Sequence, residues 1–253
     1  MKPERDHRRC FVEPAAWRGE LLTLAAGEWH HLVHVLRVQP GDGVEVFDGA
    51  GRTGRAELGA AGPALRLRQS TQHPRPAVEL HLLQALPREQ VLDAIIPKAV
   101  ELGVTRISVA PAERSVARLQ ADRLPGKIAR WRQLALNAAR QCGAAWLPEL
   151  AVFPALENLF QALTAGPIRP DFWIVGSLAA YAPPLRAALA AAAPARAPAQ
   201  IGVLIGPEGD LTPAELAAAQ AAGAVPVSFG PLTLRVDTAA LFALSVLRYQ
   251  FSA

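Results

Sequence analysis

The sequence has few of the residues on which disulfide-rich, metal-binding and membrane-spanning proteins depend. It contains only two cysteines, Cys10 and Cys142, which lie far apart in the chain. This excludes a disulfide framework and a thiol-rich metal site, and we expect both thiols to be reduced. No apolar stretch reaches the roughly 20 residues that a membrane-spanning helix needs, so we expect no membrane partner.

The chain also begins without the features of a secreted protein. The segment from Met1 to Arg9 is rich in charge, and no apolar segment of the kind found in secretory signals follows it. We therefore expect the protein to stay in the cytoplasm. Of the 253 residues, 51% are hydrophobic and 19% charged, which is ordinary for a globular protein with a sizeable core. The length allows one large domain, or a small domain joined to a larger one.

Signature motifs of several enzyme classes are missing as well. There is no Walker A motif, no glycine-rich dinucleotide fingerprint after the first strand, and no Gly-x-Ser-x-Gly elbow. His30, His31 and His34 lie close enough in sequence to bind a metal, but no further ligand is evident. We expect these histidines to be exposed or to face RNA, and we expect no metal.

One segment of the chain is strongly basic. Eight cations and two anions lie between Thr105 and Arg140, although the net charge of the whole chain is only +4. Nearly all the cations are arginines, whose guanidinium groups bind phosphate oxygens in pairs and stack on bases. The segment predicts either a face that binds nucleic acid or a solvated helix surface.

The first third of the chain has the pattern of short strands separated by turns. Val44–Phe47 follows a Pro-Gly turn, and Leu65–Arg68 alternates apolar and charged residues, as a half-buried strand does. Gly27–Val38 has the spacing of a helix. Short strands with one helix predict a small β-barrel over residues 1–73, and Pro74 and Pro76 mark a linker after it.

Beyond the linker, strands and helices alternate. The expected helices are Arg88–Leu102 and Leu124–Cys142, each followed by a glycine suited to a left-handed end. The expected strands are Val78–Gln84, Arg106–Ala110, Phe172–Val175, Ile201–Ile205 and Val225–Phe229. This order predicts the α/β class, with a mostly parallel sheet covered by helices over residues 77–253.

A glycine-bearing loop follows the strand Ile201–Ile205. It reads Gly206-Pro207-Glu208-Gly209, and the next helix start is marked by Thr212 and Glu215, which have the spacing of a capping box. Open α/β sheets bind ligands at this edge, where glycines allow a close approach and Glu208 can face a cation. On its own, the segment also fits a Pro-Gly turn with a surface glutamate.

A second loop repeats the arrangement after Val225–Phe229. It reads Gly230-Pro231-Leu232-Thr233-Leu234-Arg235, and a long apolar helix follows with Asp237 or Thr238 as its expected N-cap. Arg235 is a lone cation here, so it is either paired for structural reasons or part of a pocket. Because two such loops end neighbouring strands, we expect a pocket.

At these loops and along the whole chain, the sequence resembles the bacterial 16S ribosomal RNA uridine N3-methyltransferases of the SPOUT superfamily. The family pattern has glycine where Asp210 stands. The segments that carry the resemblance are Arg9–Phe11, His31–Arg37, Gly41-Asp42, Phe47–Gly49, Lys98–Val104, Glu113–Ser115, Gln141–Gly143, Leu204–Gly209, Leu234-Arg235 and Asp237–Ala239.

The resemblance implies a fold, a cofactor and partners. It implies a PUA-like RNA-binding barrel over residues 1–73 and a SPOUT methyltransferase domain with a deep trefoil knot over residues 77–253, an exception to the rule that folds are unknotted. It implies S-adenosyl-L-methionine as cofactor, ribosomal RNA or the assembled small subunit as substrate, and a homodimer with active sites at the subunit interface. The implied cofactor-binding residues are Gly176, Leu204, Gly206, Glu208, Gly209, Phe229, Gly230, Leu232, Leu234 and Arg235.

The chemistry of methylation at uridine N3 suggests roles for three residues. Loss of the N3 proton places negative charge on the flanking carbonyl oxygens, which Arg235 can stabilise. Glu208 or Asp237 can accept the proton or face the sulfonium, and the sequence does not choose between them. The residues expected to hold RNA phosphates are Arg9, Arg37, Arg52 and Arg114.

Three other functions remain open. An unrelated small-molecule enzyme on an α/β fold is the last of them, since it would leave the arginine-rich segment and the barrel without a role. A SPOUT ribose 2′-O-methyltransferase shares the knot but usually has an Asn-rich Ser-Leu-Asn loop where this chain has Leu234-Arg235-Val236-Asp237. A non-catalytic RNA-binding factor in ribosome assembly needs no cofactor site.

Overall fold

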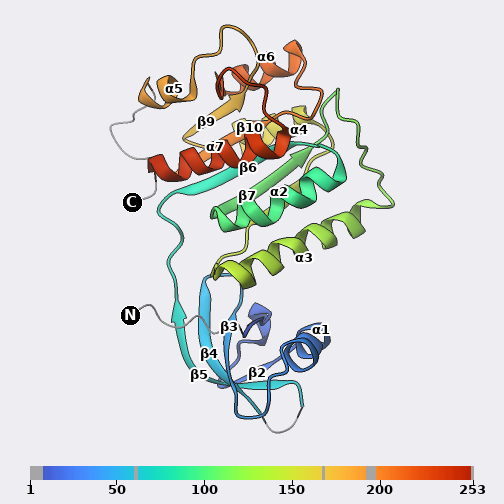
Figure 1. Ribbon diagram of the computed structural model, residues 1–253, viewed down its shortest axis with the longest axis vertical. Helices are drawn as coiled ribbons and strands as arrows, with labels where there is room; N and C mark the ends of the chain where they lie inside the picture. The colour runs from blue at the N-terminus through green and yellow to red at the C-terminus, as the bar shows by residue number, and fades with distance from the viewer. Residues whose placement is uncertain (1–7, 60–61, 167–168, 192–197, 252–253) are drawn as a thin grey trace. The chain divides into compact units, whose positions relative to one another are not determined.

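The computed structural model describes residues 8–59, 62–166, 169–191 and 198–251, which form two compact units (Figure 1). Unit 1 comprises residues 1–75 and 136–147, and unit 2 comprises residues 76–135 and 148–253. The division falls between Arg75 and Pro76, within the predicted linker. Unit 1 also includes the end of helix α3 (Leu124–Cys142), which the boundaries expected from sequence do not anticipate.

Unit 1 is built on a five-stranded sheet. Its strands are β1 (Arg9–Phe11), β2 (Leu21–Thr23), β3 (Gly43–Phe47), β4 (Arg52–Leu58) and β5 (Ala64–Gln72). Their order is β1-β3-β4-β5-β2, with β1 parallel to β3 and the other neighbours antiparallel. Apolar side chains such as Leu22, Leu32 and Val46 are fully buried and form its core.

The helix expected over Gly27–Val38 in unit 1 is shorter and irregular. After the short 3-10 turn η1 (Pro14–Ala16), helix α1 (Ala26–His30) runs directly into a π-helical turn, η2 (His31–Val35). The helix ends before Val38 because Arg37 takes a left-handed conformation, with φ of 54°. Left-handed residues stop a helix, and a non-glycine residue there is uncommon.

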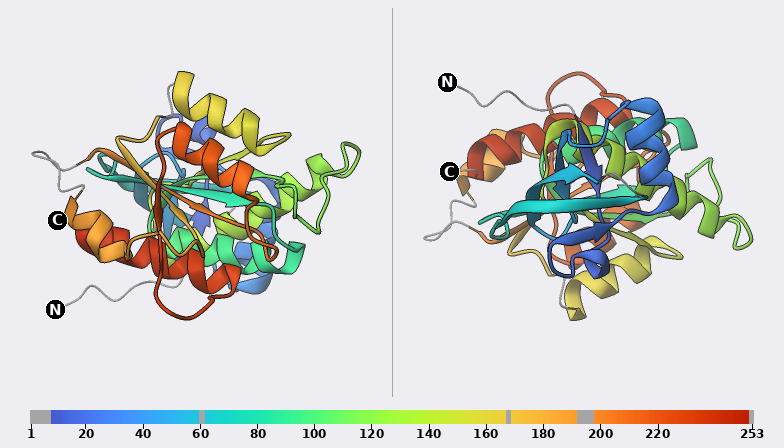
Figure 2. Two further views of the ribbon diagram at one scale, coloured as in Figure 1. Left: turned by 90° about the horizontal axis from the view of Figure 1, so that it is seen from above. Right: turned by 90° about the horizontal axis from the view of Figure 1, so that it is seen from below.

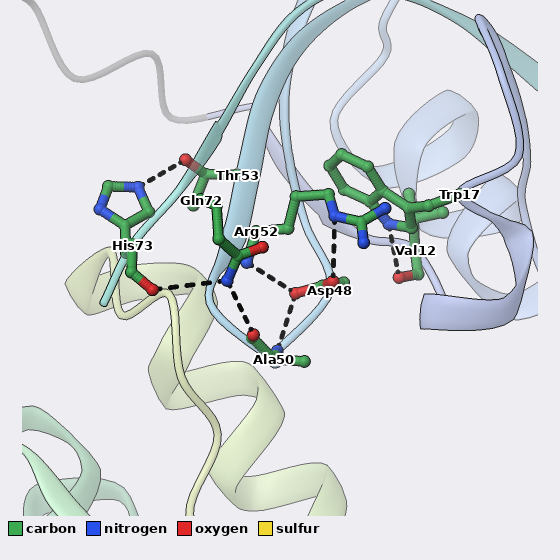
Figure 3. A network of polar contacts seen from close by, with 8 residues as sticks. All are labelled: Val12, Trp17, Asp48, Ala50, Arg52, Thr53, Gln72 and His73. Atoms are coloured by element: carbon green, nitrogen blue, oxygen red, sulfur yellow. Dashed lines mark hydrogen bonds and ion pairs between the residues drawn. The ribbon is translucent and has the colours of Figure 1, made fainter. Parts of the chain in front are cut away.

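One acidic side chain builds the turn between β3 and β4 (Figure 3). Oδ1 of Asp48 accepts hydrogen bonds from the backbone N–H groups of Ala50, at 2.7 Å, and of Arg52, at 2.9 Å. Nearby, Nε2 of Gln72 donates to the carbonyl oxygen of Ala50 at 3.3 Å, which fastens the same turn to the end of β5. Asp48 is buried, so its carboxylate gains from these bonds what it loses on leaving water.

Unit 2 is built on a six-stranded sheet in which every neighbouring pair is parallel. Its order is β11-β9-β10-β6-β7-β8. The strands are β6 (Glu79–Ala85), β7 (Val104–Ala110), β8 (Glu149–Val152), β9 (Phe172–Gly176), β10 (Gln200–Ile205) and β11 (Val225–Val227). β9 and β10 are almost entirely apolar because both faces of a parallel sheet are covered by helices.

Helices cover both faces of this sheet (Figure 2). α2 (Glu89–Glu101) and α7 (Val236–Phe251) pack together on one face. On the other face, α4 (Leu156–Ala165) and α6 (Pro213–Ala221) bury Phe160 against Trp173 of β9, with ring centroids 6.1 Å apart. A further short helix, α5 (Leu185–Ala191), precedes β10 and contacts β11.

Local sequence signals correctly predicted several ends of helices in unit 2. Thr212 and Glu215 form the expected capping box, with both reciprocal hydrogen bonds present. Gly103 follows α2 with a φ of 76°, as a left-handed helix end requires. The expected N-cap at Asp237 or Thr238 is wrong, because α7 begins at Val236 and Asp237 lies in its first turn. A carboxylate in the first turn still interacts favourably with the helix dipole.

A buried histidine lies in the middle of this sheet. Nε2 of His81, in β6, lies 2.8 Å from Oγ of Ser108 in β7, and both side chains are buried. Burial, together with the positive charge of Arg106, lowers the pKa of His81 from 6.5 to about 3. The imidazole is therefore neutral in the folded protein at neutral pH.

Candidate active site

A cavity of about 640 Å³ lies in unit 2 at the edge where β9, β10 and β11 end. Its walls come from the loops that follow these three strands and from the start of α2. The strands before the two predicted loops, β10 and β11, are not neighbours as expected from the sequence, because β9 lies between them. Their loops still meet, because parallel strands all end at the same edge of the sheet. The lining residues are Arg88, Val91, Gly176–Leu178, Ile205–Glu208, Asp210, Ser228–Gly230, Leu232–Asp237 and Ala239.

Close packing in the walls favours glycine at two of the predicted positions, and more strongly at the first. A Cβ on Gly176 would lie 2.7 Å from the ring of Phe229, closer than real side-chain carbons come. A Cβ on Gly206 would lie 3.2 Å from Oδ1 of Asp210, which is tight but closer to normal contact. Gly176 therefore allows the loops after β9 and β11 to approach each other, and this places Phe229 in the wall.

Asp210 occupies a backbone conformation that usually requires glycine. Its φ is 59°, in the left-handed region, where aspartate is one of the better-tolerated residues. Its Oδ1 accepts a hydrogen bond from the backbone N–H of Leu211 at 2.8 Å. This local bond stabilises the turn, so an aspartate can stand where the family pattern has glycine.

The cavity carries charges of both signs. Three acidic residues, Glu208, Asp210 and Asp237, and two arginines, Arg88 and Arg235, line it. Oε1 of Glu208 accepts a hydrogen bond from the backbone N–H of Arg88 at 3.0 Å. By contrast, no side-chain hydrogen bond or ion pair joins Arg235 or Asp237 to any residue of the described ranges. The structure therefore does not support the alternative in which Arg235 forms a structural ion pair.

The dimensions and composition of this cavity suit a cofactor that combines apolar parts with a net positive charge. Ligand pockets commonly enclose about 300–1,000 Å³, with mostly apolar walls and a few oriented polar groups. Ile205, Phe229 and Leu234 supply apolar surface, and the three acidic residues outnumber the two arginines, so the lining favours a ligand of net positive charge such as a sulfonium. The residues present therefore fit S-adenosylmethionine.

Most of the predicted cofactor-binding residues lie together in the wall of this cavity. These are Gly176, Gly206, Glu208, Phe229, Gly230, Leu232, Leu234 and Arg235. Leu204 is instead fully buried in the core of unit 2. Gly209 lies against Arg114, whose Nη1 donates to its carbonyl oxygen at 3.3 Å.

Sequence reasoning missed several lining residues. Ser177 follows the predicted strand Phe172–Val175, and that position is the signal that could have found it. Ser228 lies within the predicted strand Val225–Phe229, but β11 ends at Val227, so Ser228 belongs to the loop. Arg88 and Val91 come from the start of α2, more than a hundred residues before the two loops. No local pattern connects them with the site, because only the sheet order brings β6 and its following helix beside β10.

Arg9, one of the predicted RNA contacts, is buried within unit 1. It is 4% exposed, and its guanidinium bonds to Glu45 and to the carbonyl oxygens of Ala139 and Ala144. Its guanidinium carbon also lies 4.0 Å from the centroid of the Phe47 ring. Arg9 therefore fastens the end of α3 and the residues after it to the sheet of unit 1.

The other two arginines predicted in unit 1 are more accessible. Arg37 is exposed at the left-handed end of η2. Arg52 is about 40% exposed, lies 3.8 Å from the Asp48 carboxylate, and stacks over the ring of Trp17 at 5.1 Å (Figure 3). Its charge is only partly compensated, because the ion pair is long.

Half of the basic segment between Thr105 and Arg140 is used in ion pairs within the units. Lys127 and Arg130 of α3 pair with Glu89 and Asp93 of α2, at 2.9 and 2.6 Å. Arg106 pairs with Glu149, and Arg140 pairs with Glu28. The local excess of positive charge is therefore smaller in the folded chain than in the sequence. Arg114, which contacts the loop at Gly209, is an exposed member.

The structure adds little to the expectations on metals, thiols and membranes. The rings of His30 and His34 lie 4.7 Å apart, and no group of three or more metal-ligating side chains occurs among the described residues. Cys10 and Cys142 are free, and burial raises the pKa of the Cys10 thiol to about 12. Within the ranges that the structure covers, no helix is both long and apolar enough to cross a membrane.

Comparison with protein families and curated proteins identifies the chain's relatives. The RNA methyltransferase domain family matches residues 73–248, and the RNA methyltransferase PUA domain family matches residues 24–63. A protein of Synechocystis named ribosomal RNA small subunit methyltransferase E is 34% identical over 94% of this chain and 76% of its own length. The protein of the same name from Mycobacterium bovis is 30% identical over 92% of this chain and 88% of its own length.

The chain belongs to the ribosomal RNA small subunit methyltransferase E family. This confirms the family resemblance found in the sequence, and the match over residues 24–63 confirms a PUA domain at the N-terminal end.

Solved structures of similar chains agree with this assignment. A methyltransferase from Legionella pneumophila, in complex with the cofactor S-adenosylmethionine, has a TM-score of 0.83 and 25% identity, covering 96% of this chain and 97% of its own. The ribosomal RNA small subunit methyltransferase E of Neisseria gonorrhoeae, bound to S-adenosylmethionine, has a TM-score of 0.79 and 25% identity, covering 96% and 98%. The predicted α/β class with a parallel sheet is confirmed.

Proposed function

We propose that this chain methylates uridine N3 in 16S ribosomal RNA, with S-adenosylmethionine as methyl donor. The observation that carries the proposal is the cavity at the ends of β9, β10 and β11. Arg235 and Asp237, which have no side-chain partner in the described ranges, line it beside apolar residues. Support for the donor and for the RNA class comes from the relatives, which are named for methylation of small-subunit RNA or were solved with S-adenosylmethionine bound.

The chain's own residues would bind and orient the cofactor. The close packing of Gly176 and Phe229 and the backbone of Gly206 shape a cavity for its apolar parts, and the carboxylates favour its positive charge. When bound, the cofactor supplies an electrophilic methyl group on a cationic sulfur. Apolar walls exclude water, which strengthens these electrostatic interactions and keeps the methyl group from competing nucleophiles.

Arg235 and a carboxylate would assist the loss of the proton from the uracil ring. The N3–H proton leaves to a carboxylate, Glu208 or Asp237, and the resulting charge is shared by the two flanking carbonyl oxygens of uracil. Arg235 would stabilise that charge; its guanidinium has no partner in the described part of the chain and lines the cavity, which supports this role. The N3 lone pair then forms the new N–CH₃ bond as the carbon–sulfur bond breaks, so alignment in the cavity matters most.

RNA would be bound by the N-terminal domain, residues 1–73, and by the basic segment between Thr105 and Arg140, which belongs mainly to the methyltransferase domain, residues 77–253. Arg37 and Arg52 in unit 1 and Arg114 in unit 2 are the exposed or half-exposed cations that support this role. The protein would act in the cytoplasm, with naked ribosomal RNA or the assembled small subunit as its substrate.

We also propose that the chain is knotted and forms a homodimer, as the family resemblance implies. Large apolar side chains are exposed on α7 and on the loops beside the cavity, and such patches mark interfaces. They are Leu178 and Leu232, at 63% and 75% exposure, and Phe242 and Tyr249, at 40% and 88%. If α7 forms the dimer interface, the wild type should sediment as a dimer and Tyr249→Asp as a monomer in analytical ultracentrifugation.

The proposed function is tested by methylation assays with identified products. Purified protein is incubated with S-adenosylmethionine labelled in its methyl group and with naked 16S RNA or assembled small subunits. We expect labelled 3-methyluridine, and a loss of at least about a hundredfold in kcat for Arg235→Ala with the fold intact, as expected for removal of a stabilising charge. Lys127→Ala, which removes a cation paired away from the cavity, is the matched control.

Other products would identify the alternatives. Label on the ribose would make the protein a 2′-O-methyltransferase. Tight binding to RNA without any binding of S-adenosylmethionine would make it a non-catalytic assembly factor. Full turnover by Arg235→Ala would contradict the role given to this residue.

A further inference from the structure

The loop Gly206–Gly209 is fixed at three points by residues distant in the sequence. At its root, Nε2 of the fully buried Gln84 donates to the carbonyl oxygen of Ile205 at 3.3 Å. At its tip, Nη1 of Arg114 donates to the carbonyl oxygen of Gly209 at 3.3 Å. Between them, Oε1 of Glu208 accepts from the backbone N–H of Arg88 at 3.0 Å. Glu208 is the only one of the three side chains that belongs to the loop itself.

The bond made by Glu208 matches one half of a capping box. In a capping box, a glutamate at the third helical position accepts from the backbone N–H of the N-cap residue. α6 has this arrangement, since Oε2 of Glu215 accepts from the backbone N–H of Thr212 at 2.8 Å. In α2 the N-cap residue is Arg88, and the third helical position is Val91, which has no acceptor.

Glu208 therefore supplies the hydrogen-bond acceptor for the N-cap N–H of α2, which the sequence of α2 itself lacks. The N-cap side chain of α2 makes no capping hydrogen bond, and an arginine has no acceptor atom to make one. A carboxylate at a helix start is favoured both by the hydrogen bond and by the helix dipole. Arg88, Val91 and Glu208 all line the cavity, so the same bond connects two of its walls.

Asp237 is in a different situation. It lies in the first turn of α7, two residues after Arg235, and its carboxylate has no hydrogen-bond partner in the described ranges. A carboxylate that takes up a proton from a substrate must be free to meet that substrate within hydrogen-bond distance. Of the two carboxylates that the sequence left as alternatives, only Asp237 has both oxygens available.

We propose that Glu208 is a positioning residue, which ties the Gly206–Gly209 loop to the start of α2 and so sets the cavity for its cofactor, while Asp237 accepts the uridine N3 proton. The inference rests on the proposed function for the identity of the cofactor and the substrate. The tie between Glu208 and α2 does not depend on that function.

Two substitutions of Glu208 separate positioning from proton transfer. Glu208→Gln keeps a carbonyl oxygen that can accept from Arg88 N–H but cannot accept a proton, whereas Glu208→Ala removes the acceptor altogether. We expect Glu208→Ala to weaken S-adenosylmethionine binding about tenfold, the effect of losing one hydrogen bond to a charged group. Glu208→Gln is expected to restore most of that affinity, and to lose less than about tenfold in kcat.

Asp237→Asn provides the matched comparison among the carboxylates of the cavity. We expect it to lose less affinity for S-adenosylmethionine in calorimetry than Glu208→Ala does, because it removes a charge but no hydrogen bond between the walls of the cavity. Its kcat should fall by about a hundredfold or more, as removal of a general base does. Its pH–rate profile should also lose the limb that reports the proton acceptor, whereas Glu208→Gln should keep that limb.

Hydrogen exchange gives a readout that needs neither cofactor nor RNA. In the full-length protein, Glu208→Ala should speed exchange of the amide of Arg88 by about tenfold, and Glu208→Gln should slow it again. Unchanged exchange and unchanged affinity in Glu208→Ala would overturn the positioning role. So would a loss of a hundredfold or more in kcat by Glu208→Gln at unchanged affinity. If the wild type itself neither binds S-adenosylmethionine nor methylates RNA, the proposed function fails, while the exchange result still decides the tie.

Discussion

Mild acid should destabilise the folded chain through His81. Its imidazole is buried in the parallel sheet beside Ser108, 2.8 Å away, and its pKa is lowered from 6.5 to about 3 by burial and by Arg106. The folded protein therefore keeps His81 neutral at pH values where an unfolded chain would protonate it. Stability is full above pH 6.5 and is lost as the pH falls toward 3, because the unfolded state gains a proton first.

The size of this effect follows from the two pKa values. At pH 5, about 1.5 pH units below the unfolded value, protonation favours the unfolded state by about 2 kcal/mol relative to pH 8, at 1.36 kcal/mol for each unit. The full figure applies because His81 is buried, so solvent screens it little. Two kcal/mol is a large fraction of the stability of an ordinary domain.

Urea unfolding at pH 8 and pH 5 measures the effect, with His81→Gln as the variant that cannot titrate. Other groups contribute equally to both proteins, so we expect the pH dependence of the unfolding free energy to be about 2 kcal/mol smaller in the variant. His34→Gln, which removes an exposed histidine of unit 1, should keep the wild-type dependence. An equal pH dependence in His81→Gln and wild type, or an NMR titration of His81 between pH 5 and 7, would refute the reasoning.

Three further predictions concern the site and the RNA surface. Gly176→Ala should weaken S-adenosylmethionine binding severalfold, because its Cβ displaces the Phe229 ring; calorimetry measures this, with Gly27→Ala, where a Cβ meets nothing within 4 Å, as control. Gly206→Val should also weaken binding, but by pushing Asp210 and Leu211 rather than by entering the cofactor space directly, so undiminished affinity would contradict the loop assignment. Arg37→Ala should weaken RNA binding and reduce its salt dependence by about one ion, which filter binding over a range of salt concentrations measures. Arg9→Ala should leave that salt dependence unchanged but lower the free energy of unfolding by about 2 kcal/mol, which urea unfolding measures.

Much of unit 2 could be predicted because its signals are local. β10 is a continuous apolar run, and α3 has the bounds that its sequence pattern predicts. The start of α6 follows from Thr212 and Glu215, three residues apart, because a capping box needs no partner outside its own turn. The start of α7 could not be predicted in the same way, since Asp237 serves equally well as a cap or inside the first turn.

The roles of charged residues were harder to predict than the strands and helices. In the sequence, Arg9 and Arg37 are both arginines near turns, but the fold buries the first against Ala139 and Ala144 and leaves the second exposed. The basic segment likewise loses part of its apparent charge, because α2 supplies Glu89 and Asp93 as partners. Such pairings depend on which elements become neighbours, and no local pattern reports them.

By itself, the sequence determined the α/β class, the two loops at the strand ends and the residue types available to bind a cofactor. These follow from the spacing of apolar residues and from turn chemistry, which act over a few residues. Only the tertiary structure decided how these residues are used. It set Phe229 against Gly176, tied Glu208 to a helix start 120 positions earlier, and left Arg235 and Asp237 without side-chain partners among the residues that the structure describes. The physical reason is that β10 lies between β6 and β9, so its following loop meets elements from both earlier and later parts of the chain.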